Sequence, residues 1–242
     1  MSTNDVTAPA RSTHSPTTLA RLASELIGSA GLAATVVGSG IMATQLSDDV
    51  GLQLTINALA TGMGLVVLIA VLGPIGGAHF NPAVTLALAT TGRFAWREVP
   101  GYVLLQIAGC SLGVIAANLM FDAPAVGVSI TERATTSTVF AEVLATAGLV
   151  ASILLLLRFE KSAWIAPVVG LYIASAYSVT SSTSFANPAI TIARTLSDTF
   201  AGIAPSSVPW YLAAQLVGAA VGVAVALLLS RTTPVASTTA RG

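Results

Sequence analysis

Long apolar segments separated by short polar connections dominate the hydrophobic pattern of this chain. Six of them are long enough to cross a bilayer as an α-helix, which takes about 20 residues. We place these spans at residues 19–46, 52–71, 99–120, 139–157, 163–179 and 210–229. Two further apolar segments, residues 81–89 and 187–196, are too short to cross and are predicted to be re-entrant half-helices. The pattern therefore predicts an all-α membrane protein with six transmembrane helices and two half-helices.

Both short segments open with the tripeptide Asn-Pro-Ala, once at Asn81, Pro82 and Ala83 and again at Asn187, Pro188 and Ala189. Asn caps a helix well, because its side-chain oxygen accepts a hydrogen bond from a free backbone N–H. Pro suits the first turn, where its missing N–H costs nothing. A helix that begins at membrane depth is tolerated where protein buries it or where it lines a watery cavity. Two matching starts therefore predict a pore or binding site near the midplane.

The two halves of the chain, residues 19–120 and 136–230, repeat each other beyond these tripeptides. Spans one and four begin with similar sequences, which contain Glu25 and Glu142. Spans three and six share a pattern of Pro, Tyr, Gln and Gly at the same spacing, in which the glutamines are Gln106 and Gln215. Three spans per half is an odd number, so the second half must enter the membrane inverted. The half-helix N-termini, which carry positive partial charge, should then meet at mid-depth and repel cations and protons.

Composition excludes several classes of function. Hydrophobic residues make up 54% of the 242 residues and charged residues 8%, against about a quarter charged in soluble domains. The formal net charge is zero, which leaves no basic surface for nucleic acid. Cys110 is the one cysteine, so neither an internal disulfide nor a Cys-based metal site can form. Without a nucleophile and base, a metal cluster or a phosphate loop, we expect no enzyme and no cofactor.

Arg and Lys residues set the expected orientation. All but Arg133 and Arg194 precede span one, lie between spans two and three or between spans four and five, or follow span six, which places them on one side, the cytoplasm. The polar segments 1–18 and 231–242 are predicted to be disordered cytoplasmic ends of a channel domain at residues 19–230. We expect a multi-pass protein of the cell membrane, and the excess of Arg over Lys is typical of a bacterial one.

The segment from Gly77 to Thr85, the second Asn-Pro-Ala, the repeated Glu and the inverted repeat together resemble the aquaporin or major intrinsic protein family over about residues 20–229. The resemblance implies a passive, homotetrameric channel for water and small neutral solutes, with one pore per subunit. It implies that Glu25 and Glu142 accept hydrogen bonds from the re-entrant loops, although intramembrane carboxyls can also form a proton relay. His79 either lines the inner vestibule or only fixes its loop.

The chain departs from the family at the narrowest part of the pore. Water and glycerol channels normally place Arg directly after the second Asn-Pro-Ala, where this chain has Ile190, and glycerol channels follow it with Asp, where this chain has Thr191. The resemblance assigns the other filter positions to Thr61, Ser184 and either Tyr177 or Ser175. Such a lining implies a wide filter for glycerol, urea or neutral metalloid acids such as arsenite.

Arg194 follows Ile190 by four residues, about one helical turn. An anchoring role within the half-helix, with Asp198 as its partner, is favoured over a role in the pore.

Two other functions remain open. An ion- or proton-coupled secondary transporter also uses inverted repeats and broken helices, and Glu25 and Glu142 are the carboxylates that could serve it. A non-conducting structural member of the family would keep the fold without the flux.

Overall fold

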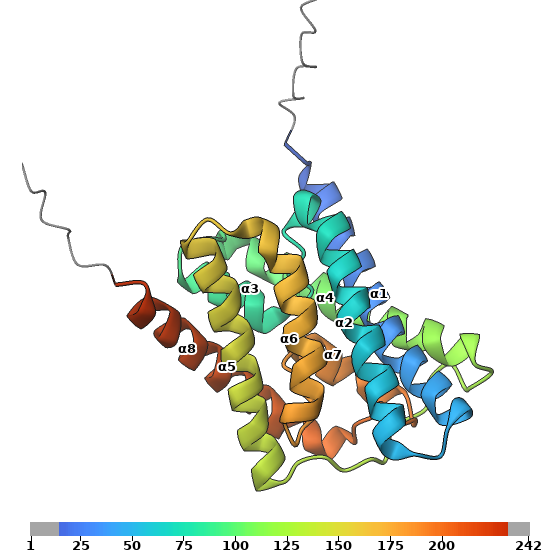
Figure 1. Ribbon diagram of the computed structural model, residues 1–242. Helices are drawn as coiled ribbons and strands as arrows, with labels where there is room; N and C mark the ends of the chain where they lie inside the picture. The colour runs from blue at the N-terminus through green and yellow to red at the C-terminus, as the bar shows by residue number, and fades with distance from the viewer. Residues whose placement is uncertain (1–14, 232–242) are drawn as a thin grey trace, which may run out of the picture.

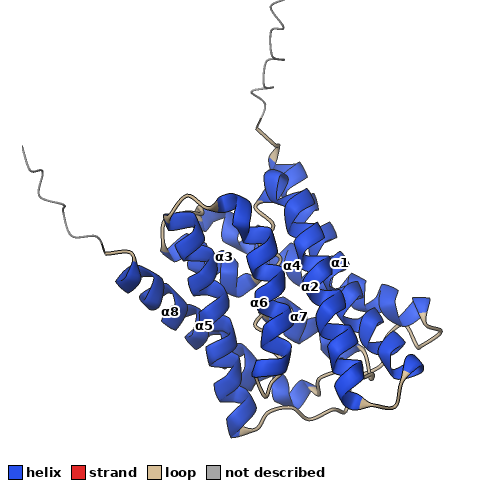
Figure 2. Cartoon of the chain, viewed as in Figure 1, coloured by secondary structure: helices blue, strands red, loops and turns tan. Residues whose placement is uncertain are grey.

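The structure is a computed structural model that describes residues 15–231. Over this range it contains helices and loops but no strands (Figure 2). The long helices are α1 (Thr18–Leu46), α2 (Val50–Gly76), α4 (Val99–Met120), α5 (Thr136–Arg158), α6 (Ile165–Val179) and α8 (Val208–Leu229). The short ones are α3 (Pro82–Thr90) and α7 (Pro188–Ala193), with single 3₁₀ turns η1 (Trp96–Glu98), η2 (Ser162–Trp164), η3 (Arg194–Leu196) and η4 (Pro205–Ser207). The six spans and two half-helices are therefore present.

Several predicted boundaries were wrong. Helix α2 continues past residue 71 to Gly76, where Gly77 ends it in the left-handed conformation with φ 90°. The second half-helix is shorter than predicted, because α7 stops at Ala193 and only the 3₁₀ turn η3 continues to Leu196. Most of the segments predicted to be disordered lie outside the described residues, but Thr18 already begins α1, capped by the Thr17 side chain.

The same helix packing occurs in both halves of the chain. Helix α1 packs along α4, and α5 packs along α8. A Cβ added to Gly109 of α4 would lie 2.3 Å from the Leu26 carbonyl oxygen, and one added to Gly218 of α8 would lie 2.5 Å from that of Val143. These matched glycines let the paired helices touch backbone to backbone, as small residues do in membranes.

Helices α3 and α7 lie in the middle of the bundle and are enclosed by the long helices (Figure 1). Ala83 and Thr85 of α3 and Ala189 and Thr191 of α7 have no exposed surface. Helix α2 from the first half packs along α6 from the second, closing the bundle across the repeat. The fold thus holds both half-helices where the two halves meet.

Candidate functional site

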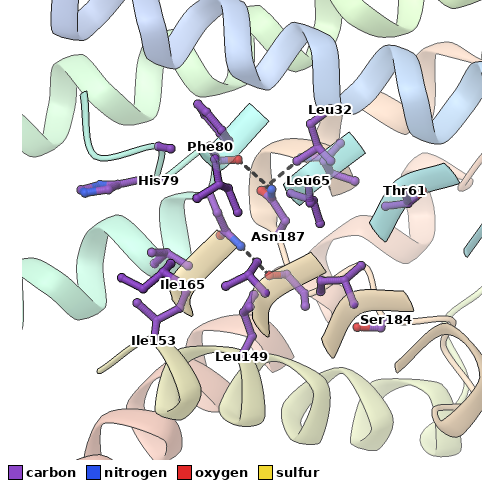
Figure 3. A pocket seen from close by; sticks show the side chains of 18 of the residues that line it. Leu32, Thr61, Leu65, His79, Phe80, Leu149, Ile153, Ile165, Ser184 and Asn187 are labelled. Atoms are coloured by element: carbon purple, nitrogen blue, oxygen red, sulfur yellow. Dashed lines mark hydrogen bonds between the residues drawn. The ribbon is translucent and has the colours of Figure 1, made fainter. Parts of the chain in front are cut away.

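The N-termini of the two half-helices meet through their asparagines. Each Asn caps its own helix, since Oδ1 of Asn81 accepts from the Ala83 N–H at 2.9 Å and Oδ1 of Asn187 from the Ala189 N–H at 3.0 Å. Nδ2 of Asn187 donates to the Phe80 carbonyl at 2.8 Å, drawn as a dashed line in Figure 3. Nδ2 of Asn81 donates to the Ala186 carbonyl at 2.7 Å. One amide hydrogen of each Asn is thereby occupied, and the other remains for a molecule in the cavity.

The loops that lead into the half-helices share an unusual backbone. Ala78 and Phe80, three and one residues before Asn81, have φ of 50° and 48°, and Ser184 and Ala186, at the matching places before Asn187, have φ of 49° and 46°. Non-glycine residues rarely adopt positive φ, and such strain persists only where surrounding contacts hold it. The amino-acid types at these four positions do not predict this conformation.

Two fully buried carboxylates hold these loops. Glu25 of α1 accepts hydrogen bonds from the backbone N–H groups of His79 and Phe80, both at 2.8 Å. Glu142 of α5 accepts from those of Phe185 and Ala186, both at 2.9 Å. Each carboxylate thus satisfies two backbone donors that would otherwise be unpaired in the protein interior.

A glutamine and a threonine extend each carboxylate contact to the half-helix. Nε2 of Gln106 donates to Glu25 at 2.7 Å and to the Thr85 hydroxyl at 2.9 Å. The Thr85 hydroxyl donates in turn to the Asn81 carbonyl at 3.0 Å. The second half contains the same network, formed by Gln215, Glu142, Thr191 and Asn187. Sequence reasoning missed the role of the threonines, although both follow Asn-Pro-Ala at the same spacing.

A central cavity of about 320 Å³ surrounds the two asparagines. Of the residues predicted for a filter, Thr61, Tyr177, Ser184 and Ile190 all line it. The hydroxyl groups of Thr61 and Tyr177 are 3.4 Å apart. Ser175 lies instead in a separate groove between α5 and α6, so the structure places Tyr177, not Ser175, at the cavity.

Most of the remaining cavity wall is aliphatic. Figure 3 shows Leu32, Leu65, Leu149, Ile153 and Ile165 around Asn187. A largely apolar wall with a few polar groups is typical of small-molecule sites, where the polar groups fix orientation. The cavity therefore suits a compact solute that has both polar and apolar surface.

His79 borders this cavity and also fixes its loop. Its Nδ1 pairs with the Thr85 hydroxyl at 3.0 Å, and its ring centroid lies 4.8 Å from that of Phe94 and 5.2 Å from that of Tyr102. His79 therefore lies at the cavity wall and also contacts its own loop, so the two interpretations do not exclude each other.

The expected pairing of Arg194 with Asp198 was wrong. Nε of Arg194 donates to the Ala201 carbonyl, and the buried side chain lines the cavity. Asp198 accepts from the Ile130 backbone N–H at 3.2 Å instead. Tertiary contact with the loop after η3 directs the arginine toward the cavity.

The loop between α4 and α5 closes over the segment that follows η3. Arg133 donates to the Phe200 carbonyl at 2.8 Å, and burial lowers the pKa of its guanidinium. Glu132 accepts from the hydroxyls of Ser206 and Ser207, which hold the pKa of its carboxyl below the usual value.

Between residues 15 and 231, no three His, Cys, Asp or Glu side chains gather as metal ligands would.

Comparison with known proteins gives consistent matches. The family model described as Major intrinsic protein matches residues 12–186. Aquaglyceroporin AqpS of Rhizobium meliloti (strain 1021) is 46% identical over 207 residues, covering 85% of this chain and 88% of that protein. Aquaporin NIP1-1 of Zea mays is 52% identical over 64 residues, 26% of this chain and 23% of its own length. The X-ray structure of the aquaglyceroporin from Plasmodium falciparum shares the fold, with a TM-score of 0.66 at 20% identity over 88% of this chain and 96% of that one.

Proposed function

Because the chain belongs to the major intrinsic protein family, we propose that it is a passive transmembrane channel for water and small uncharged solutes. The observation that carries this proposal is the meeting of two half-helix N-termini inside one cavity, with Asn81 and Asn187 in its wall. Each Asn keeps one N–H for a solute oxygen, which can exchange its hydrogen bonds with water for these donors.

The N-termini also support rejection of positive charge. Aligned peptide dipoles leave about half an elementary charge at each helix N-terminus, and two such ends face the same point of the cavity. A proton or a metal cation would meet this potential in a wall that is mostly apolar and cannot replace its hydration. A neutral molecule experiences neither penalty.

We assign the solutes to the class of glycerol, urea and neutral metalloid acids such as arsenite. Thr61, Ser184 and Ile190 offer no charge and little bulk at the filter positions, and Tyr177 adds one hydroxyl. The name of the Rhizobium relative, an aquaglyceroporin, agrees with a solute larger than water. In this proposal water passes too, but the wide filter does not select for it.

The proposed setting is a bacterial plasma membrane, with both termini in the cytoplasm and four copies forming a tetramer of independent pores. Six helices of the described chain are long and apolar enough to span the bilayer. Lipid is then the main partner, and neither nucleic acid nor a catalytic cofactor has a part.

Stopped-flow light scattering on proteoliposomes tests the proposal. Vesicles with purified protein should swell faster than empty vesicles in inward gradients of glycerol, urea and arsenous acid, with no ion gradient present. A flux that appears only with a proton or sodium gradient would show a coupled transporter instead. No acceleration for water or any of these solutes would show a non-conducting member of the family.

A further inference from the structure

The inverted repeat places two residues in the cavity wall at matching distances after each Asn-Pro-Ala. Val84 and Leu88, three and seven residues after Asn81, both line the cavity. At the same distances from Asn187 stand Ile190 and Arg194, which also line it. Positions four apart lie on one face of a helical segment, so this face is turned to the cavity in both halves. Where the first half has a leucine, the second has an arginine.

Two contacts fix this arginine in place. Its Nε donates to the Ala201 carbonyl, and its guanidinium carbon lies 3.5 Å from the centroid of the Phe185 ring. Arg133 lies 5.5 Å from the same ring centroid but is absent from the cavity lining. A cation over an aromatic face is attracted by the ring's electron density, which holds the charge without neutralising it.

The charge of Arg194 has no carboxylate partner in the described part of the chain. The one ion pair there joins Arg21 to Glu98. Nor do its two terminal nitrogens form hydrogen bonds to any residue from 15 to 231. The Ser184 hydroxyl is buried in the same cavity wall and is likewise without a hydrogen-bond partner there. Polar groups left unpaired in a bilayer-embedded protein are costly and are usually functional.

We propose that Arg194 sets the charge selectivity of the channel, one turn away from Ile190, while Ile190 sets its width. This inference rests on the proposed function and deepens it. A fixed positive charge acts strongly beside a low-dielectric wall, so a cation is stopped beside Arg194 before it reaches the half-helix N-termini. The N–H groups of Arg194 that have no partner give a neutral polyol or weak acid a polar contact as it enters. One residue could select both the size and the charge of the solute. In this proposal, Ile190 selects the size and Arg194 selects the charge.

The test measures glycerol swelling and cation conductance on the same proteoliposome preparations. In Arg194→Gln we expect the ratio of potassium conductance to glycerol flux, measured on the same vesicles, to rise by about tenfold or more, because the fixed charge is gone. Arg194→Lys keeps the charge and should keep cations out. Arg133→Gln, which removes the other arginine from the Phe185 ring, is the matched control and should stay impermeable to potassium.

The inference is overturned if Arg194→Gln excludes potassium as well as the wild type does, or if Arg194→Lys conducts as much as Arg194→Gln. Should Arg194→Gln not fold, Arg194→Met removes the charge and keeps an unbranched side chain against the Phe185 ring. Its potassium conductance should then exceed that of the wild type by about tenfold or more, and an Arg194→Met variant that excludes potassium as well as the wild type does overturns the inference. Absence of glycerol flux in the wild type would instead refute the proposed function.

Discussion

At the scale of single residues, we propose that Ile190, which follows the second Asn-Pro-Ala, limits the width of the cavity. Ile190 is buried and lines the cavity beside Thr61 and Tyr177, whose hydroxyls approach each other from α2 and α6. An aliphatic side chain here leaves space and adds no donor. A long, charged side chain at the same place would narrow the passage and would also lie near Arg194.

Ile190→Arg should therefore reduce glycerol and arsenous acid flux by about tenfold or more and water flux much less, since pore diameter limits the larger solutes first. Stopped-flow swelling with each solute measures this, and Ile190→Leu, which conserves volume, serves as the control. An equal loss for every solute would mean that Ile190 does not set the size limit.

At the scale of elements, each half-helix depends on a carboxylate from a neighbouring span. Glu25 and Glu142 are fully buried and together accept four backbone N–H groups from the two re-entrant loops. Those loops contain the left-handed residues that direct the Phe80 and Ala186 carbonyls toward the opposite asparagines. Loss of a carboxylate oxygen that accepts these N–H groups would therefore disturb the geometry of the loop first, and the charge of the site only second.

Glu25→Gln and Glu142→Gln test this role, because an amide oxygen replaces only one of the two acceptor oxygens. We expect each variant to unfold earlier in detergent, by about 1–3 kcal/mol for the backbone donor left unpaired. Solute flux through the remaining folded protein should stay independent of any ion gradient. Variants as stable as the wild type that alter a proton-driven flux would favour the transporter.

Much of this arrangement could be predicted from the sequence, for identifiable reasons. Asn81 and Asn187 could be placed together because a repeated helix start within apolar sequence has few solutions in a membrane. The path of the loops could not, because Ala78 and Phe80 are ordinary residues in a left-handed conformation, in a loop that Glu25 holds by its hydrogen bonds. The direction of Arg194 was also beyond local reasoning, since it depends on the Ala201 carbonyl and the Phe185 ring.

At the scale of the whole molecule, large apolar side chains remain exposed along the outside of the described bundle. Leu59, Met63 and Val67 of α2 and Leu216 and Val217 of α8 are among them. Lipid or a neighbouring copy must cover such a surface. The cavity itself is enclosed within one chain, so assembly is not needed to complete it.

We expect a homotetramer in which every subunit conducts alone. Native mass spectrometry in detergent should give a mass four times that of the protomer. In tetramers that mix wild-type and Ile190→Arg subunits, glycerol flux should fall in proportion to the variant fraction. A steeper fall would indicate a shared pore, and a monomer in both detergent and lipid would refute the assembly.

The central claim is that one solute molecule passes between Asn81 and Asn187, and electron cryo-microscopy in lipid nanodiscs with glycerol tests it most directly. The account predicts both tripeptides at the depth of the bilayer midplane, with solute density within hydrogen-bonding distance of both Nδ2 atoms. A map with either tripeptide outside the bilayer, or with asparagines too far apart to contact one solute, would contradict it.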